Sequence, residues 1–149
     1  MPTPFESASL LLTLYDQRRE ETMRKARDFF IGFDPRTYEE YMAGIMGPQS
    51  AYIRMVVTYW DMAASFVVNG AIDQKMFQDA AGGEYIIVFA KIEPFIPQIR
   101  EAYGNPNFAA NLEKVVFAMP NAREMVDSTL IRIRGMLAAR AAAAAQAKS

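Results

Sequence analysis

The 149-residue sequence contains no cysteine and no histidine. Without cysteine the chain forms no disulfide, a composition typical of reducing compartments. Without histidine it lacks the base of Ser-His-Asp and Cys-His catalysis and the usual ligand of zinc, copper and haem iron. Any chemistry would have to use carboxylates, lysine, arginine, tyrosine or backbone groups. The sequence therefore leans against an enzyme, and we expect no cofactor, no metal and no catalytic residue.

The sequence also lacks an excess of either charge and any long apolar run. The net charge of −1 offers no field to attract phosphate backbones, so we expect no nucleic-acid partner. The longest uncharged runs, residues 41–53 and 62–72, are too short for a membrane-spanning helix of about 20 residues. We expect a soluble, cytoplasmic protein without a transmembrane segment.

Apolar residues make up 52% of the chain, and most of them recur at helical spacing. We expect a long first helix over residues 5–31, ended by Gly32, and a short second helix that starts at Asp34-Pro35 and runs to Met46. The third helix, over residues 48–68, has the widest apolar face and should be central and buried. That face consists of Ile53, Val56, Val57, Trp60, Ala63, Ala64 and Val67.

The second half of the chain is read as four more helices. Asp73 is the expected N-cap of a short helix, and residues 80–83, with Gly82-Gly83, form an expected turn. Residues 84–103 form a buried helix with Glu84 in its first turn and a kink near Glu93, before Pro94. A strand at residues 85–89 is disfavoured because no other segment offers it a partner.

Residues 106–118 and a last helix from Met119-Pro120 complete the predicted architecture, an all-α compact bundle of five to seven helices. The last helix carries a narrow apolar seam typical of helix pairing: Val126, Leu130, Ile133 and Leu137. We interpret residues 1–137 as one domain. Residues 138–149 form an alanine-rich extension, expected to fray or to dock on a partner.

A polar stripe borders the apolar face of the third helix, because Arg54 and Asp61 lie near Trp60. In the structural interpretation, Asp61 forms an interhelical ion pair with Arg18, Arg27 or Arg100 and fixes helix register. In the functional interpretation, the same groups surround a pocket that binds a small molecule or performs acid–base chemistry. We favour the structural interpretation.

Several short motifs occur in a fixed order along the chain: Tyr59-Trp60-Asp61-x-x-Ala64, Gly70-x-Ile72-Asp73, Glu93-Pro94-x-x-Pro97-x-x-Arg100, Gly104-Asn105-Pro106 and Asn111-Leu112-Glu113. This series resembles an uncharacterised bacterial family of small helical domains of unknown function, many of which carry an N-terminal membrane helix. The resemblance implies an all-helical fold and a bacterial source, and it implies no activity or catalytic residue. The chain departs from the family in having no obvious membrane anchor.

Two functions of different classes follow. The leading one is a non-catalytic interaction or accessory subunit that forms helical contacts with itself or with a larger partner. The alternative is a small-molecule-binding protein or carboxylate-dependent enzyme with a pocket around Trp60, Asp61 and an arginine. A weaker third interpretation uses the basic last helix, where five basic residues stand against two acidic ones, for contact with a membrane surface or nucleic acid.

Overall fold

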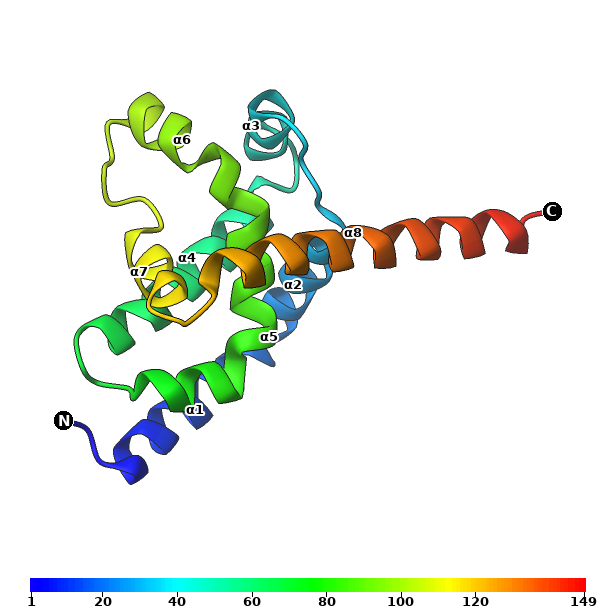
Figure 1. Cartoon of the computed structure of the whole chain (residues 1–149). Helices are drawn as coiled ribbons and strands as arrows, with labels where there is room; N and C mark the ends of the chain where they lie inside the picture. Colours follow the sequence, from blue (N-terminus) through cyan, green and yellow to red (C-terminus); the bar gives the residue numbers. More distant parts are fainter.

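The computed structural model describes all residues, 1–149, and consists of helices and turns without a strand (Figure 1). The all-α prediction is confirmed, and the segment around Tyr85 is helical. The helices are α1 (Pro4–Arg18), α2 (Glu21–Gly32), α3 (Tyr38–Met46), α4 (Ser50–Val68), α5 (Gln74–Ile92), η1 (Glu93–Phe95), α6 (Ile96–Tyr103), α7 (Ala110–Phe117) and α8 (Ala122–Ala147).

The prediction of one long helix over residues 5–31 is wrong, because this segment forms two helices, α1 and α2. The break falls at Arg19 and Glu20, and the carboxylate of Glu20 accepts hydrogen bonds from the backbone N–H groups of Thr22 and Met23 at 3.0 and 2.9 Å. The side chain thereby satisfies two of the free donors at the start of α2. The predicted end at Gly32 is correct.

The start of α3 also differs from the prediction. Thr37, not Asp34, is the N-cap, and its hydroxyl accepts from the N–H of Glu40 at 3.1 Å. Asp34 instead remains in the loop and pairs with Arg36 and with Arg134 of α8, at 3.0 Å each. The loop carboxylate therefore ties the end of α2 to the last helix.

The central position predicted for the third helix is confirmed by α4. All seven residues of its predicted apolar face are buried, and α4 packs against α2, α3, α5 and α7. Asn69 and Gly70 end the helix as expected, with Gly70 in the left-handed region at φ 78°. This helix forms the wall between the surface clefts described below.

The predicted turn at Gly82-Gly83 is wrong, because α5 runs without interruption from Gln74 to Ile92. Asp73 is its N-cap, as predicted, and its carboxylate accepts from the N–H of Met76 at 2.8 Å. The buried neighbours of the glycines in α5 keep this stretch helical against its low propensity. The predicted kink is confirmed by the 3-10 turn Glu93–Phe95, which separates α5 from α6.

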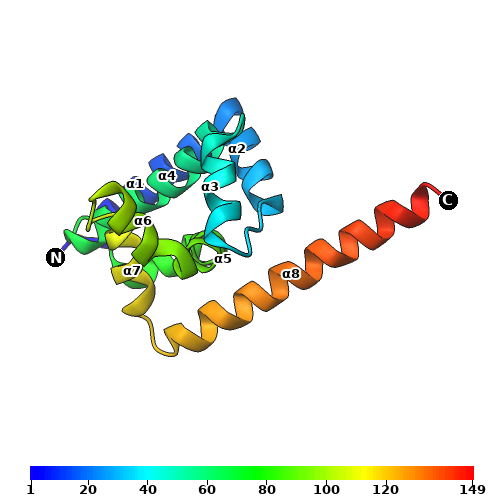
Figure 2. The same ribbon diagram turned by 90° about the horizontal axis from the view of Figure 1, so that it is seen from above.

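The last helix lies across the bundle and then leaves it. Helix α7 begins at Ala110, four residues later than the 106 expected, after a turn in which Gly104 has φ 58°. The first half of α8 packs on α5, and Figures 1 and 2 show that its second half extends away from the other helices. All residues from Ala138 onward are exposed.

Candidate functional site

The five residues of the predicted polar cluster do not form one site. Trp60 and Arg18 lie together, with the guanidinium carbon of Arg18 5.2 Å from the centre of the indole ring. Arg54, Asp61 and Arg100 each make separate contacts elsewhere. The polar pocket expected around Trp60 and Asp61 is therefore absent as an arrangement of these residues.

Asp61 forms no ion pair with an arginine, which contradicts the structural interpretation of the sequence. Its Oδ1 accepts from the N–H groups of Asn111 and Leu112 at 3.0 and 2.9 Å, and its Oδ2 accepts from the Asn111 amide at 3.3 Å. Helix α7 has no cap from its own neighbouring residues, and Ala109 before it has φ 54°. Asp61 thus caps α7 from another helix, and its negative charge suits the helix N-terminus.

Arg100 and Arg54 lie on other parts of the surface. Arg100 of α6 donates two hydrogen bonds to the carbonyl of Phe108, at 3.0 and 2.9 Å, and pairs with Glu113 at 3.4 Å. These contacts fold the loop between α6 and α7 back onto α6. Arg54 is exposed, and its one side-chain contact is a 3.3 Å hydrogen bond to Ser50.

The charged centre near Trp60 is Glu84, which the sequence analysis placed in the first turn of a helix over residues 84–103. Glu84 lies inside α5 and pairs with Arg27 at 2.7 and 2.8 Å and with Arg18 at 3.2 Å. The hydrogen bonds that Arg27 donates to Glu84 raise the pKa of Arg27 above its usual value. The partners are separated by 57 and 66 residues, so no spacing in the sequence indicated this cluster.

An apolar cleft of about 360 Å³ lies beside this cluster, between α1, α4 and α5. We call it the Trp60 cleft; its walls include Leu11 and Tyr15 of α1, Trp60 of α4 and Phe77 of α5. Arg18 is the one charged residue that lines it, and that charge is already paired with Glu84. The indole Nε1 of Trp60 is buried without a hydrogen-bond partner.

Tyr59 of α4 also lines the Trp60 cleft. Its hydroxyl donates to the carbonyl of Leu14 at 2.5 Å, and burial raises its pKa to about 12. The hydroxyl is therefore protonated at neutral pH and engaged in a contact between α4 and α1. No carboxylate lines the Trp60 cleft, so its geometry suits binding of an apolar or aromatic group rather than acid–base chemistry.

The four residues of the predicted seam on α8 face the protein's own bundle to different degrees. Val126 and Ile133 are buried, at 1% and 7% exposure, and Leu130 and Leu137 are partly buried. Two ion pairs hold this half of the helix, Arg123 with Glu93 and Arg134 with Asp34. The residue of α8 that presents a large apolar side chain to solvent is Ile131, at 74% exposure.

None of the helices combines the length and the hydropathy that a bilayer crossing requires. No group of three or more acidic side chains is arranged to hold a metal ion.

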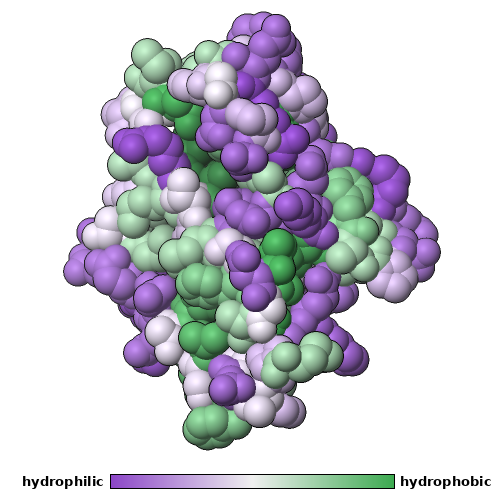
Figure 3. Space-filling model, turned by 90° about the vertical axis from the view of Figure 1, so that its left-hand side faces the viewer, coloured by the Kyte–Doolittle hydropathy of each residue, from purple (hydrophilic) through white to green (hydrophobic).

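On the side of α6 and α7, Figure 3 shows apolar residues at the surface between hydrophilic ones.

The fold and its contacts define a small helical domain in which the interhelical polar contacts described above cap helix ends or pair charges. The chain belongs to the family described as a domain of unknown function, DUF4760, which matches residues 4–118. Comparison with curated proteins and with solved structures gives no significant match. Helix α8 lies outside the matched residues.

Proposed function

We propose that this protein is a non-catalytic interaction module that associates with a second copy of itself through α8. The observation that carries the proposal is the projection of this 26-residue helix beyond the bundle (Figure 2). Two ion pairs, Arg123 with Glu93 and Arg134 with Asp34, and the buried Val126 and Ile133 anchor its first half. The second half is thereby held at a fixed direction in solvent, which suits a docking element.

The outward face of α8 supports pairing with another helix. Ile131 points away from α5, since Thr129 and Ile133 on the opposite face are buried. Gly135 follows one turn later with open space at its Cβ position, although glycine inside a helix costs about 1 kcal/mol relative to alanine. A glycine at this position lets a second helix approach closely, with the exposed isoleucine of that copy packed over it.

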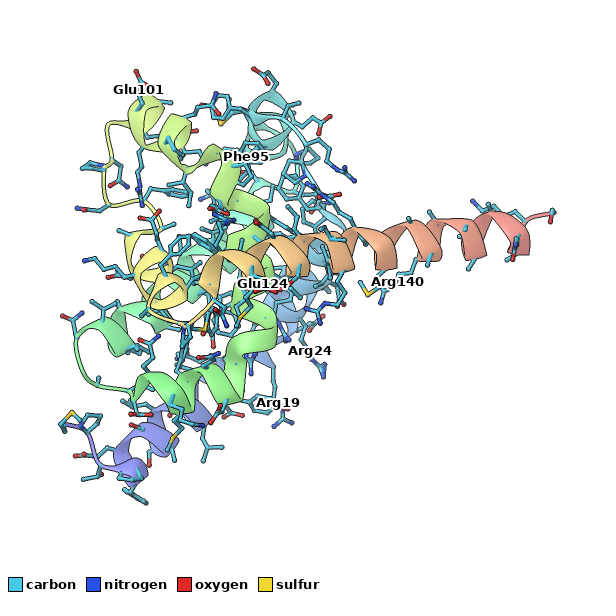
Figure 4. All side chains as sticks on the ribbon, in the orientation of Figure 1. Arg19, Arg24, Phe95, Glu101, Glu124 and Arg140 are labelled. Carbon is cyan, nitrogen blue, oxygen red and sulfur yellow. The ribbon has the colours of Figure 1, made fainter.

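Symmetry favours the same arrangement. In an antiparallel pair in which Ile131 of each copy packs over Gly135 of the other, the same face of both copies forms the interface, as a two-fold axis requires. Arg140 lies on the projecting half, away from the bundle (Figure 4).

Light scattering after gel filtration tests this proposal across a range of protein concentrations. We expect a dimer for the full chain, a monomer for Ile131→Glu, and an unchanged dimer for Glu21→Gln, a control on the exposed surface of α2. Circular dichroism should show the same helix content in all three. A wild-type monomer at high concentration, or a dimer that survives both Ile131→Glu and removal of residues 138–149, would overturn the proposal.

A second candidate function, binding of a small apolar molecule, is supported by the Trp60 cleft. Its volume of about 360 Å³ is within the range of ligand sites, and most of its lining is apolar. Trp60 is the single tryptophan of the chain, so its fluorescence reports on this cleft. Titration with toluene should change the emission, whereas Ala80→Leu, which adds bulk at the lining, should weaken the change. An emission unaffected by millimolar toluene argues against this function.

A further inference from the structure

A second cleft, larger than the Trp60 cleft, lies on the other part of α4. It has a volume of about 570 Å³ and is enclosed by α3, α4, α6 and the loop that follows α6. We call it the Tyr41 cleft; its residues used below are Tyr41, Ala51, Arg54, Ile99 and Tyr103. Most of its surface is apolar, and none of its lining residues is acidic.

Tyr41 gives the cleft a polar group, a hydroxyl that is not fully buried. The residue is 3% exposed and packs between the rings of Phe33 and Phe95, with centroids 6.2 and 5.9 Å away. Its hydroxyl has no hydrogen-bond partner in the protein, in contrast to that of Tyr59. Burial raises the pKa of Tyr41 to about 12, so the hydroxyl is a donor at neutral pH. Because Tyr41 lines the cleft, that donor is available to a bound molecule.

Arg54 gives the same cleft a positive charge that no carboxylate neutralises. Its guanidinium contacts Ser50 alone, whereas Arg18, Arg27, Arg100, Arg123 and Arg134 are all paired with acidic side chains. A guanidinium prefers carboxylates because its planar donors match the two oxygens. An unpaired arginine at the edge of an apolar cleft is thus suited to the head group of an amphipathic anion.

We propose that the Tyr41 cleft binds a small monocarboxylate with an apolar tail or ring, whose carboxylate is held by Arg54 and whose apolar part lies against Ile99 and the other apolar walls. The volume is within the range of small-molecule sites, which usually combine apolar walls with a few polar groups. The absence of acidic lining residues excludes a cationic head group on electrostatic grounds. This inference is independent of dimerisation through α8, because α8 contributes no residue to the cleft.

Octanoate and 1-octanol form a matched pair of probes, since they share the alkyl length and differ in the charge of the head group. Isothermal titration of the full-length protein at low salt should show octanoate binding at least fivefold tighter than octanol. Arg54→Gln should remove this difference by weakening octanoate alone. Arg24→Gln, an exposed arginine outside the cleft, should leave both affinities unchanged.

Two further variants separate this cleft from other sites. Ala51→Trp places a large side chain at an exposed lining position and should reduce binding of both probes by at least tenfold. Tyr41→Phe should leave the unliganded protein as stable as the wild type, because its hydroxyl has no bond to lose, yet weaken octanoate severalfold. The proposal is overturned if octanol binds as tightly as octanoate, if neither binds at millimolar concentration, or if binding persists in Ala51→Trp.

Discussion

Lys91 joins α5 to the end of α2 through buried hydrogen bonds. Its side chain is 2% exposed, and its ammonium donates to the carbonyl oxygens of Phe30, Ile31 and Phe33 at 2.8, 2.7 and 2.8 Å. The last carbonyls of a helix lack intrahelical partners and carry partial negative charge. Lys91 therefore acts as a C-terminal cap that is supplied from another helix.

Two opposing effects determine the result of Lys91→Met. Burial lowers the pKa of Lys91 from 10.5 to about 8, so holding the charged form in the folded protein at pH 7 costs about 3 kcal/mol. Three hydrogen bonds from a charged donor contribute about 1.5–3 kcal/mol each, which exceeds that cost. We expect the substitution to lower the free energy of unfolding by about 2–4 kcal/mol. Urea unfolding measures it, and the exposed Lys75→Met should cost less than about 0.5 kcal/mol.

The lowered pKa of Lys91 also makes stability depend on pH with a defined sign. Between pH 8 and 10.5 the unfolded chain binds more protons than the folded one, so the free energy of unfolding rises with pH. The rise should reach about 2 kcal/mol from pH 7 to 9.5 in the wild type and be missing in Lys91→Met. The comparison stops at pH 9.5 because tyrosines begin to ionise above it. Tyr41, Tyr59 and Tyr85 have pKa values of about 12 in the folded protein and 10 in the unfolded chain, so the free energy of unfolding falls as pH rises from 10 to 12. Parallel pH profiles, or a Lys91→Met protein as stable as the wild type, would refute this reasoning.

Three other substitutions test individual contacts by the same unfolding measurement. Glu84→Gln should cost about 1–3 kcal/mol, because it leaves Arg27 without a charged partner in a half-buried site; no loss would show that the pair is dispensable. Asp61→Ala should cost about 0.5–2 kcal/mol, the usual value of an N-cap, and increase amide exchange in α7. Gly44→Ala should cost about 1–3 kcal/mol, since the new Cβ would lie 2.7 Å from the ring of Phe33; a neutral result would mean that this ring moves aside easily.

Apolar spacing predicted the helices well where one face is buried and both ends carry conventional signals. In α4 the predicted face and the observed one coincide, and Asn69-Gly70 ends the helix as expected. In α5 the Asp73 cap and the kink at Glu93 were also recognisable. These features depend on residues within one or two turns of each other, which is the range over which spacing is informative.

The errors arise at an unconventional cap and at a pair of glycines held in a helix by packing. Glu20 caps α2 although glutamate is an uncommon N-cap, so the break after α1 had no conventional signal. Gly82 and Gly83 predicted a turn, yet the buried Ala81 and Tyr85 on either side hold the segment in α5. Burial against neighbouring helices outweighs the cost of two glycines, each about 1 kcal/mol.

The polar contacts of the candidate site were the least predictable part. The predicted ion pair of Asp61 with an arginine is wrong, because the carboxylate instead accepts from the backbone N–H groups at the start of α7. Glu84 forms the charged centre near Trp60 through arginines 57 and 66 residues away. Pairing at such separations depends on the packed arrangement of helices, which single-sequence spacing does not contain.

Satisfied and unsatisfied buried polar groups together indicate where this bundle accepts other molecules. Tyr59 and Tyr85 bury their rings and use their hydroxyls, in bonds to the Leu14 carbonyl and the Met119 sulfur. The indole Nε1 of Trp60 is buried without a partner, whereas the Tyr41 hydroxyl makes no hydrogen bond within the protein but is not fully buried; each residue lines a separate cleft beside α4. A buried polar group without a partner costs about 1–3 kcal/mol, so a molecule that accepts a hydrogen bond from the Trp60 indole would gain up to this amount on binding. The proposed carboxylate in the Tyr41 cleft would raise the melting temperature by mass action, and the rise would be smaller in Tyr41→Phe, which binds the carboxylate severalfold more weakly.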